Sequence, residues 1–124
     1  MRSTIFALAA LALTVAPANA QQSQIEYASV AEAKSALLAI PGVQTQNQQG
    51  WLIVNEKPGV NWSFAPEDHE AHPAVGKRQL LQGDDGRFHV RTDLMCEASK
   101  EACDRLHASY QALDEAMMKS LEKQ

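Results

Sequence analysis

The sequence predicts an α+β domain: an antiparallel sheet of four or five short strands packs, in two layers, on an N-terminal helix and a long C-terminal helix. Apolar residues recur at helical spacing within residues 30–40 and 97–122, whereas between these segments the apolar period changes to two. Short turn signals separate the strand segments, and consecutive strands joined by short turns pair antiparallel. One face of such a sheet needs a cover, which the two helices can provide.

The first twenty residues are predicted to be an export signal. Arg2 precedes the short apolar run Ile5–Val15, and Ala18-Asn19-Ala20 places small residues where a signal peptidase cleaves. The run is about half of the ~20 residues that span a bilayer. We therefore expect cleavage after Ala20, a periplasmic or secreted protein without a membrane span, and a single mature domain, residues 21–124.

The first helix of the domain is predicted to begin at Ser29. Ser29 and Glu32 fit the capping box, in which the serine accepts a hydrogen bond from a backbone N–H of the first turn and the glutamate reaches back. Pro41-Gly42 ends the helix, because proline lacks a backbone donor and its ring clashes with the preceding turn.

Five segments with strand character follow this helix. They are residues 43–46, 51–54, 60–64, 75–82 and 87–92. The first is a candidate edge strand, and the last two are joined by the tight-turn signal Asp84-Asp85-Gly86. A long helix from about Glu97 to Glu122 closes the chain, because one apolar stripe recurs there every three or four residues.

The two cysteines, Cys96 and Cys103, are predicted to form a disulfide. An even pair in an exported chain meets an oxidising compartment. Seven residues of continuous helix rise ~10 Å, whereas the Cα atoms of a disulfide lie ~5.5 Å apart. Cys96 must therefore lie outside the regular helix, so that the disulfide fixes the corner between the last strand and the helix.

Composition narrows the functional classes. The chain has a formal net charge of −4, and loss of Arg2 makes it one unit more negative, which argues against nucleic acid as a partner. The sequence contains no nucleophile elbow, P-loop, dinucleotide-binding glycine motif or haem-attachment motif. We therefore expect a non-enzymatic domain without a cofactor, with an enzyme of unidentified type as an alternative.

The segment Glu67–Val75, EDHEAHPAV, concentrates carboxylates and imidazoles. Its histidines, His69 and His72, are three residues apart, whereas the zinc motif His-Glu-x-x-His places them four apart. A zinc site also takes three or four protein ligands, and Pro73 disfavours helical geometry at His72. We predict a surface loop, and a weak divalent-metal site at His69 and His72 is the alternative.

The last predicted hairpin suggests a binding surface. If Leu81, Phe88 and Val90 point to the core, the basic side chains point away from it. These are Arg78, Arg87, His89 and Arg91. They would receive an anionic ligand or an acidic partner, or they would form a solvated face that blunts edge pairing. One of the two tryptophans, Trp51 and Trp62, is expected in the core, and the other is either exposed as a ligand anchor or covered by a helix.

The string WSFAPEDHEAHPAVGKR, from Trp62 to Arg78, followed by CEASKEACDRL, resembles a family of small exported bacterial proteins. The shared features are a W-S-F-x-P start, a His-Pro-Ala element, a Lys-Arg pair and two cysteines at a helix start. The resemblance implies that Trp62, Phe64, His72, Pro73, Lys77 and Arg78 form one unit, and it transfers no catalytic residue.

The hairpin and this resemblance together predict binding of an unknown protein partner or a small anionic ligand in the cell envelope. The expected binding residues are Trp62, His72, Lys77, Arg78, Arg87, His89 and Arg91.

Overall fold

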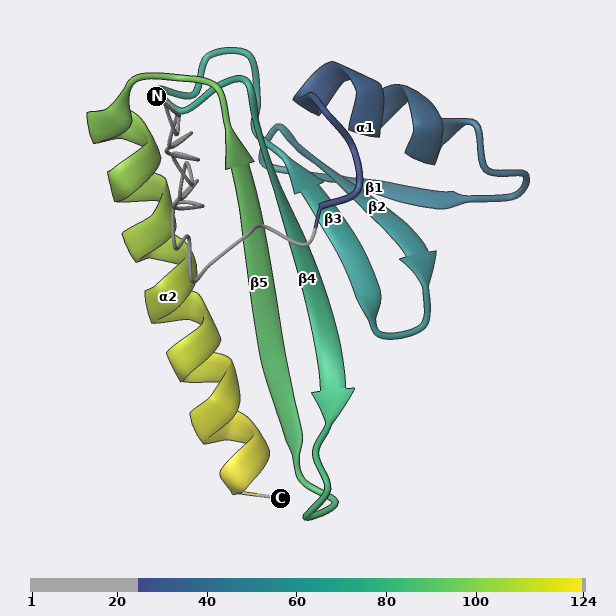
Figure 1. Ribbon diagram of the computed structural model, residues 1–124, viewed down its shortest axis with the longest axis vertical. Helices are drawn as coiled ribbons and strands as arrows, with labels where there is room; N and C mark the ends of the chain where they lie inside the picture. The colour runs from purple at the N-terminus through teal and green to yellow at the C-terminus, as the bar shows by residue number, and fades with distance from the viewer. Residues whose placement is uncertain (1–24, 124) are drawn as a thin grey trace, which may run out of the picture.

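The computed structural model describes residues 25–123, so the predicted signal peptide and the cleavage site after Ala20 lie outside the described residues. The elements are α1 (Val30–Leu38), β1 (Gln44–Gln48), β2 (Trp51–Lys57), β3 (Val60–Phe64), β4 (Ala74–Gln82), β5 (Phe88–Cys96) and α2 (Lys100–Glu122) (Figure 1). The five strands form one sheet in chain order, and every neighbouring pair is antiparallel. The predicted α+β class is confirmed. Within residues 25–123, no helix is long and apolar enough to cross a membrane.

The strand register decides which side chains share a face of the sheet. Val54 of β2 pairs with Trp62 of β3, and the adjacent residues Ile53 and Ser63 also pair. Because successive residues of a strand alternate between faces, the first pair lies on one face and the second on the other. The helix that packs on each face gives it its name below: the α1 face carries Trp62, and the α2 face carries Ser63.

The α1 face holds the core of large side chains. Ser29 caps α1 as predicted: its Oγ accepts a hydrogen bond from the Glu32 N–H at 3.1 Å, and the Glu32 carboxylate accepts one from the Ala28 N–H at 3.0 Å. The buried side chains of this core are Val30, Ala33, Leu37, Val54, Trp62, Phe64 and Val75. Their burial removes a continuous apolar surface from water.

The α2 face holds a core of smaller side chains. Ala102, Leu106 and Tyr110 are the buried residues of α2, and in Figure 1 this helix runs along β5. A Cβ atom at Gly76 would lie 2.8 Å from Cζ and the hydroxyl oxygen of Tyr110. Gly76 therefore lets the tyrosine ring approach the backbone of β4 directly.

The helices cover opposite faces of the sheet, so the layers run helix, sheet, helix, and the predicted two-layer packing is wrong. Val75 belongs to the core under α1, and its neighbour Ala74 belongs to the core under α2. The physical reason is that the central strands carry buried side chains on both faces, which a single helical layer cannot cover.

The disulfide between Cys96 and Cys103 is confirmed. Cys96 is the last residue of β5 and lies outside the helix, and the two Cα atoms are 5.8 Å apart. Residues 97–99 form the corner, and α2 begins after Ser99, whose Oγ accepts a hydrogen bond from the Ala102 N–H at 3.2 Å. The disulfide thus fixes the start of α2 to the end of β5.

Candidate functional site: a trough on the α2 face

A trough lies beside α2 on the α2 face, over β2 and β3. Its volume is about 780 Å³, which is within the usual range of ligand pockets. The sheet contributes Gln48, Trp51, Ile53, Ser63 and Arg78, and α2 contributes Leu106, Ser109, Tyr110 and Leu113. The β1–β2 turn contributes Gln49, and the loop between Pro66 and Pro73 contributes His69. Apolar and aromatic walls with a few polar groups are typical of small-molecule sites.

Arg78 is the one permanently charged residue among those that line the trough. Its side chain is 15% exposed, and its Cζ lies 5.3 Å from the centre of the Tyr110 ring. Its Nε lies 3.3 Å from Oδ1 of Asp114, which is not among the lining residues.

The ion pair between Arg78 and Asp114 leaves hydrogen-bonding capacity unused. Arg78 Nε, Arg78 Nη2 and Asp114 Oδ1 are buried, and none of these atoms has a hydrogen-bond partner among the described residues. Asp114 therefore balances the charge of the guanidinium without a well-aligned hydrogen bond. Buried charged groups gain most from hydrogen bonds, so these N–H groups favour an acceptor.

Tyr110 connects α2, the sheet and the trough. Burial raises the pKa of its phenol, while a hydrogen bond with Ser63 and the charge of Arg78 oppose this rise. The hydroxyl is therefore neutral at physiological pH and able to donate or accept. Its ring also packs edge-on against Trp51, with 6.5 Å between the ring centres.

The two tryptophans have opposite roles. Trp51 lines the trough, and its ring meets His69 edge-on, with 5.2 Å between the ring centres. Trp62, predicted as a binding residue, is fully buried under the α1 face, where it contacts Tyr27 and lies under the ammonium group of Lys77. The tryptophan that keeps part of its surface exposed is therefore Trp51, which is half-buried.

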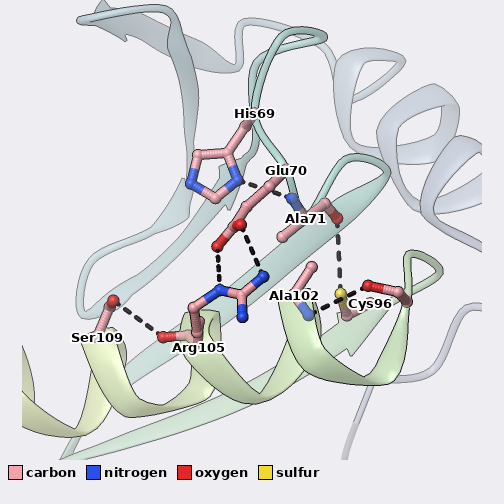
Figure 2. Close-up of polar contacts among 8 residues, drawn as sticks. His69, Glu70, Ala71, Cys96, Ala102, Arg105 and Ser109 are labelled. Atoms are coloured by element: carbon pink, nitrogen blue, oxygen red, sulfur yellow. Dashed lines mark hydrogen bonds and ion pairs between the residues drawn. The ribbon is translucent and has the colours of Figure 1, made fainter.

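Residues 66–73 form a structured surface loop, whereas Ala74 and Val75, the last two residues of the predicted loop, begin β4 and are buried. Two turn hydrogen bonds, from the His69 N–H to the Pro66 oxygen and from the His72 N–H to the His69 oxygen, are each 3.0 Å long. Glu70 accepts hydrogen bonds from Nε and Nη2 of Arg105 at 2.8 and 2.9 Å, which joins the loop to α2 (Figure 2). The hydrogen bond from Arg105 lowers the pKa of Glu70.

The two histidines of this loop lie in different surroundings. His69 is half-buried, lines the trough, and accepts a hydrogen bond at Nδ1 from the Ala71 N–H at 3.0 Å. His72 is exposed. Within residues 25–123, no group of three or more histidine, cysteine, aspartate or glutamate side chains is placed to hold a metal ion.

The strand register divides the four basic residues that were expected on one face. The predicted grouping put Leu81 beside Phe88, but Leu81 pairs with His89. Because the turn between β4 and β5 spans residues 83–87, His89 and Arg91 lie on the α1 face with Leu81, whereas Arg78 lies on the α2 face. Arg87 lies in the turn, so the single basic face does not form.

Several of the predicted binding cations already have acidic partners. Lys77 pairs with Glu26, Arg78 with Asp114, Arg87 with Asp85 and Arg91 with Asp93. The six-residue unit implied by the family resemblance is also divided, since Trp62 and Lys77 lie on the α1 face and Arg78 on the other. Of these four cations, only Arg78 is among the residues that line the trough on the α2 face.

Sequence reasoning missed most of the trough because four separate segments supply it. In the sequence, Tyr110 belongs to the apolar stripe of the last helix, and Ser63 alternates with the apolar residues Trp62 and Phe64 of its strand. One signal was available: Tyr110 and Asp114 are four residues apart, so they lie on one side of the helix and place a carboxylate beside its apolar stripe.

A scan against protein-family models, a search of curated proteins and a search of solved structures found no match to this chain. The resemblance to small exported proteins stays a prediction. The assignment of function therefore depends on the geometry of the trough.

Proposed function

We propose that this chain is an exported, non-enzymatic binding domain that holds a small organic anion with an apolar body in the trough on the α2 face. One observation carries the proposal: Arg78 lines a cavity that also has apolar and aromatic side chains in its walls, and Nε and Nη2 of its guanidinium have no hydrogen-bond partner among the described residues. The apolar run near the N-terminus and the disulfide support export.

The ligand would lie with its anionic group at Arg78 and its apolar part beside α2. A planar guanidinium recognises a carboxylate or sulfonate through parallel hydrogen bonds. Trp51 and Ile53 offer apolar surface from the sheet, and Leu113, which is 47% exposed, offers it from the helix. Covering these side chains removes apolar surface from water and adds to affinity.

The polar groups of the trough favour binding over catalysis. No carboxylate and no thiol is among the lining residues. The Ser109 hydroxyl donates to the Arg105 backbone oxygen, and Ser63 bonds to Tyr110, so neither serine is paired with His69 as a nucleophile with its base would be. These contacts fix side chains in place, as suits a binding site.

Fluorescence titration of residues 21–124 with 8-anilinonaphthalene-1-sulfonate tests this proposal, because the probe joins a sulfonate to an aromatic body. We expect binding at one site, and a loss of affinity of roughly tenfold or more in Arg78→Gln, the size expected for a charged hydrogen bond. Arg78→Lys keeps the positive charge but not the planar guanidinium, so its affinity should lie between those of the unmodified protein and Arg78→Gln.

A matched control separates the trough from the hairpin. Arg91→Gln makes the same chemical change on the α1 face, and its affinity should equal that of the unmodified protein. N-phenyl-1-naphthylamine, which lacks the sulfonate, should not distinguish Arg78→Gln from the unmodified protein. If Arg91→Gln weakens sulfonate binding and Arg78→Gln does not, the ligand site is on the hairpin and the proposal is wrong.

A further inference from the structure

Besides Arg78 and Tyr110, one more ionisable side chain lines the trough, that of His69. Its Nδ1 accepts the hydrogen bond from the Ala71 N–H, which requires the neutral ring with its proton on Nε2. Figure 2 shows this bond beside the contact between Glu70 and Arg105. This hydrogen bond is compatible with the neutral ring of His69 and not with the protonated one.

The charged groups around His69 come from three elements. On its own loop, Glu67 and Asp68 are exposed, and Glu70 is bound by Arg105 of α2. On the sheet, Arg78 lines the same trough. The residues of β1, of β2 and of the β1–β2 turn that line the trough, Gln48, Trp51, Ile53 and Gln49, are uncharged.

We infer that His69 is a pH-dependent second contact for the anion, and that the trough binds anions more tightly when this imidazole is protonated. The inference rests on the proposed function, because it concerns the same ligand in the same trough. A protonated imidazole donates from both nitrogens, so it must give up the hydrogen bond from Ala71. An anion in the trough supplies an acceptor and an opposite charge in its place.

Protonation and ligand binding are therefore linked. In the empty trough, the Ala71 N–H favours the neutral ring, whereas a bound anion favours the charged ring. Linkage is reciprocal: if the ligand promotes proton uptake, protonation promotes ligand binding to the same degree. Imidazoles change charge between about pH 5 and 8, whereas burial raises the pKa of Tyr110 and keeps its phenol neutral throughout that range.

The test is the pH dependence of 8-anilinonaphthalene-1-sulfonate affinity, since the sulfonate keeps its charge across this range. Between about pH 8 and pH 5.5 we expect affinity to rise roughly tenfold, the effect of one added opposite charge near the ligand. His69→Gln should bind with a nearly constant affinity. His72→Gln, a change at the exposed histidine of the same loop, should keep the full pH dependence.

Calorimetry provides a second measurement that needs no variant. Titrations at neutral pH in two buffers of different ionisation enthalpy should show net proton uptake on binding of the sulfonate. N-phenyl-1-naphthylamine should cause none, because it brings no charge to the trough.

The outcomes distinguish this inference from the proposed function. Binding that depends on Arg78 but does not change with pH overturns the role of His69 alone, as does a pH dependence that persists in His69→Gln. Binding that does not depend on Arg78 overturns both. A rise in affinity at low pH that requires His69, together with proton uptake, supports the inference.

Discussion

The two faces of the sheet differ in how their helices pack. On the α1 face, Leu37, Val54 and Trp62 have no exposed surface and form one apolar core with α1. On the α2 face, small residues and a tyrosine pack α2 on the sheet, and an arginine with a 15% exposed side chain lines a trough. One sheet thus separates two tasks: the α1 face supplies most of the large apolar burial, and the α2 face presents polar groups in a cavity.

The largest expected effect is on the α1 face. Trp62→Ala removes a fully buried indole and leaves a cavity, so it should lower the free energy of unfolding by about 3–5 kcal/mol. This is a large part of the stability of a small domain. Urea denaturation measures the change.

The matching change on the other face is Trp51→Ala. Trp51 is half-buried in the trough, so Trp51→Ala should lower the free energy of unfolding by less than Trp62→Ala does. It should weaken the binding of 8-anilinonaphthalene-1-sulfonate by more than Trp62→Ala does. Equal losses of stability in the two variants would contradict the division of tasks between the faces.

The disulfide is expected to come next. Replacing Cys96 and Cys103 by serine removes a crosslink between residues seven apart, and the chain-entropy model gives roughly 2.5 kcal/mol for so short a loop. The unmodified protein should shift to a lower urea midpoint on reduction, whereas the double-serine variant should not respond to reductant. Identical midpoints for the oxidised and reduced protein would show that the corner between β5 and α2 is stable without the bond.

Gly76→Ala tests the close approach of α2 to the sheet. The new methyl group would meet the ring of Tyr110 and a methyl of Leu94, so we expect a loss of about 1–3 kcal/mol from overpacking. A double-mutant cycle with Tyr110→Ala tests this contact. The double variant should lose less stability than the sum of the losses in Gly76→Ala and Tyr110→Ala, because the truncated side chain leaves room for the methyl group. Additive losses would mean that the ring does not limit this position.

The smallest expected effect concerns the bond between the loop and α2. Arg105 lowers the pKa of Glu70. The charged carboxylate therefore stabilises the folded chain at every pH above the usual pKa of a glutamate. This stabilisation disappears as the pH falls through the lowered pKa. Glu70→Gln should therefore be slightly less stable than the unmodified protein at neutral pH. The two proteins should be equally stable at about pH 3. Urea midpoints at both pH values measure this difference.

Glu67→Gln is the control for this prediction, because Glu67 is an exposed carboxylate of the same loop. It should show no such pH dependence. A difference between Glu70→Gln and the unmodified protein that grows on acidification would have the wrong sign for a lowered pKa and would contradict the role of Arg105.

The sequence by itself determined the features that depend on neighbouring residues. The capping box at Ser29, the turn at residues 84–86, the strand periods and the stripe of the last helix are local signals. The disulfide was also predictable, because two cysteines follow a predicted export signal, and helix geometry then placed Cys96 outside the helix. These features follow from a few backbone angles and from periodicity, so one segment suffices to reveal them.

The tertiary structure decided which face each side chain occupies. A strand inverts its faces when its register shifts by one residue, so the pairing of Leu81 with His89 was enough to separate Arg78 from Arg91. The partners of Arg78, Tyr110 and Asp114, are on a helix far along the chain. No local pattern predicts that α2 packs along β5 and that Tyr110 reaches β4. The trough depends on that packing, because its walls meet only after the sheet and the helix have come together.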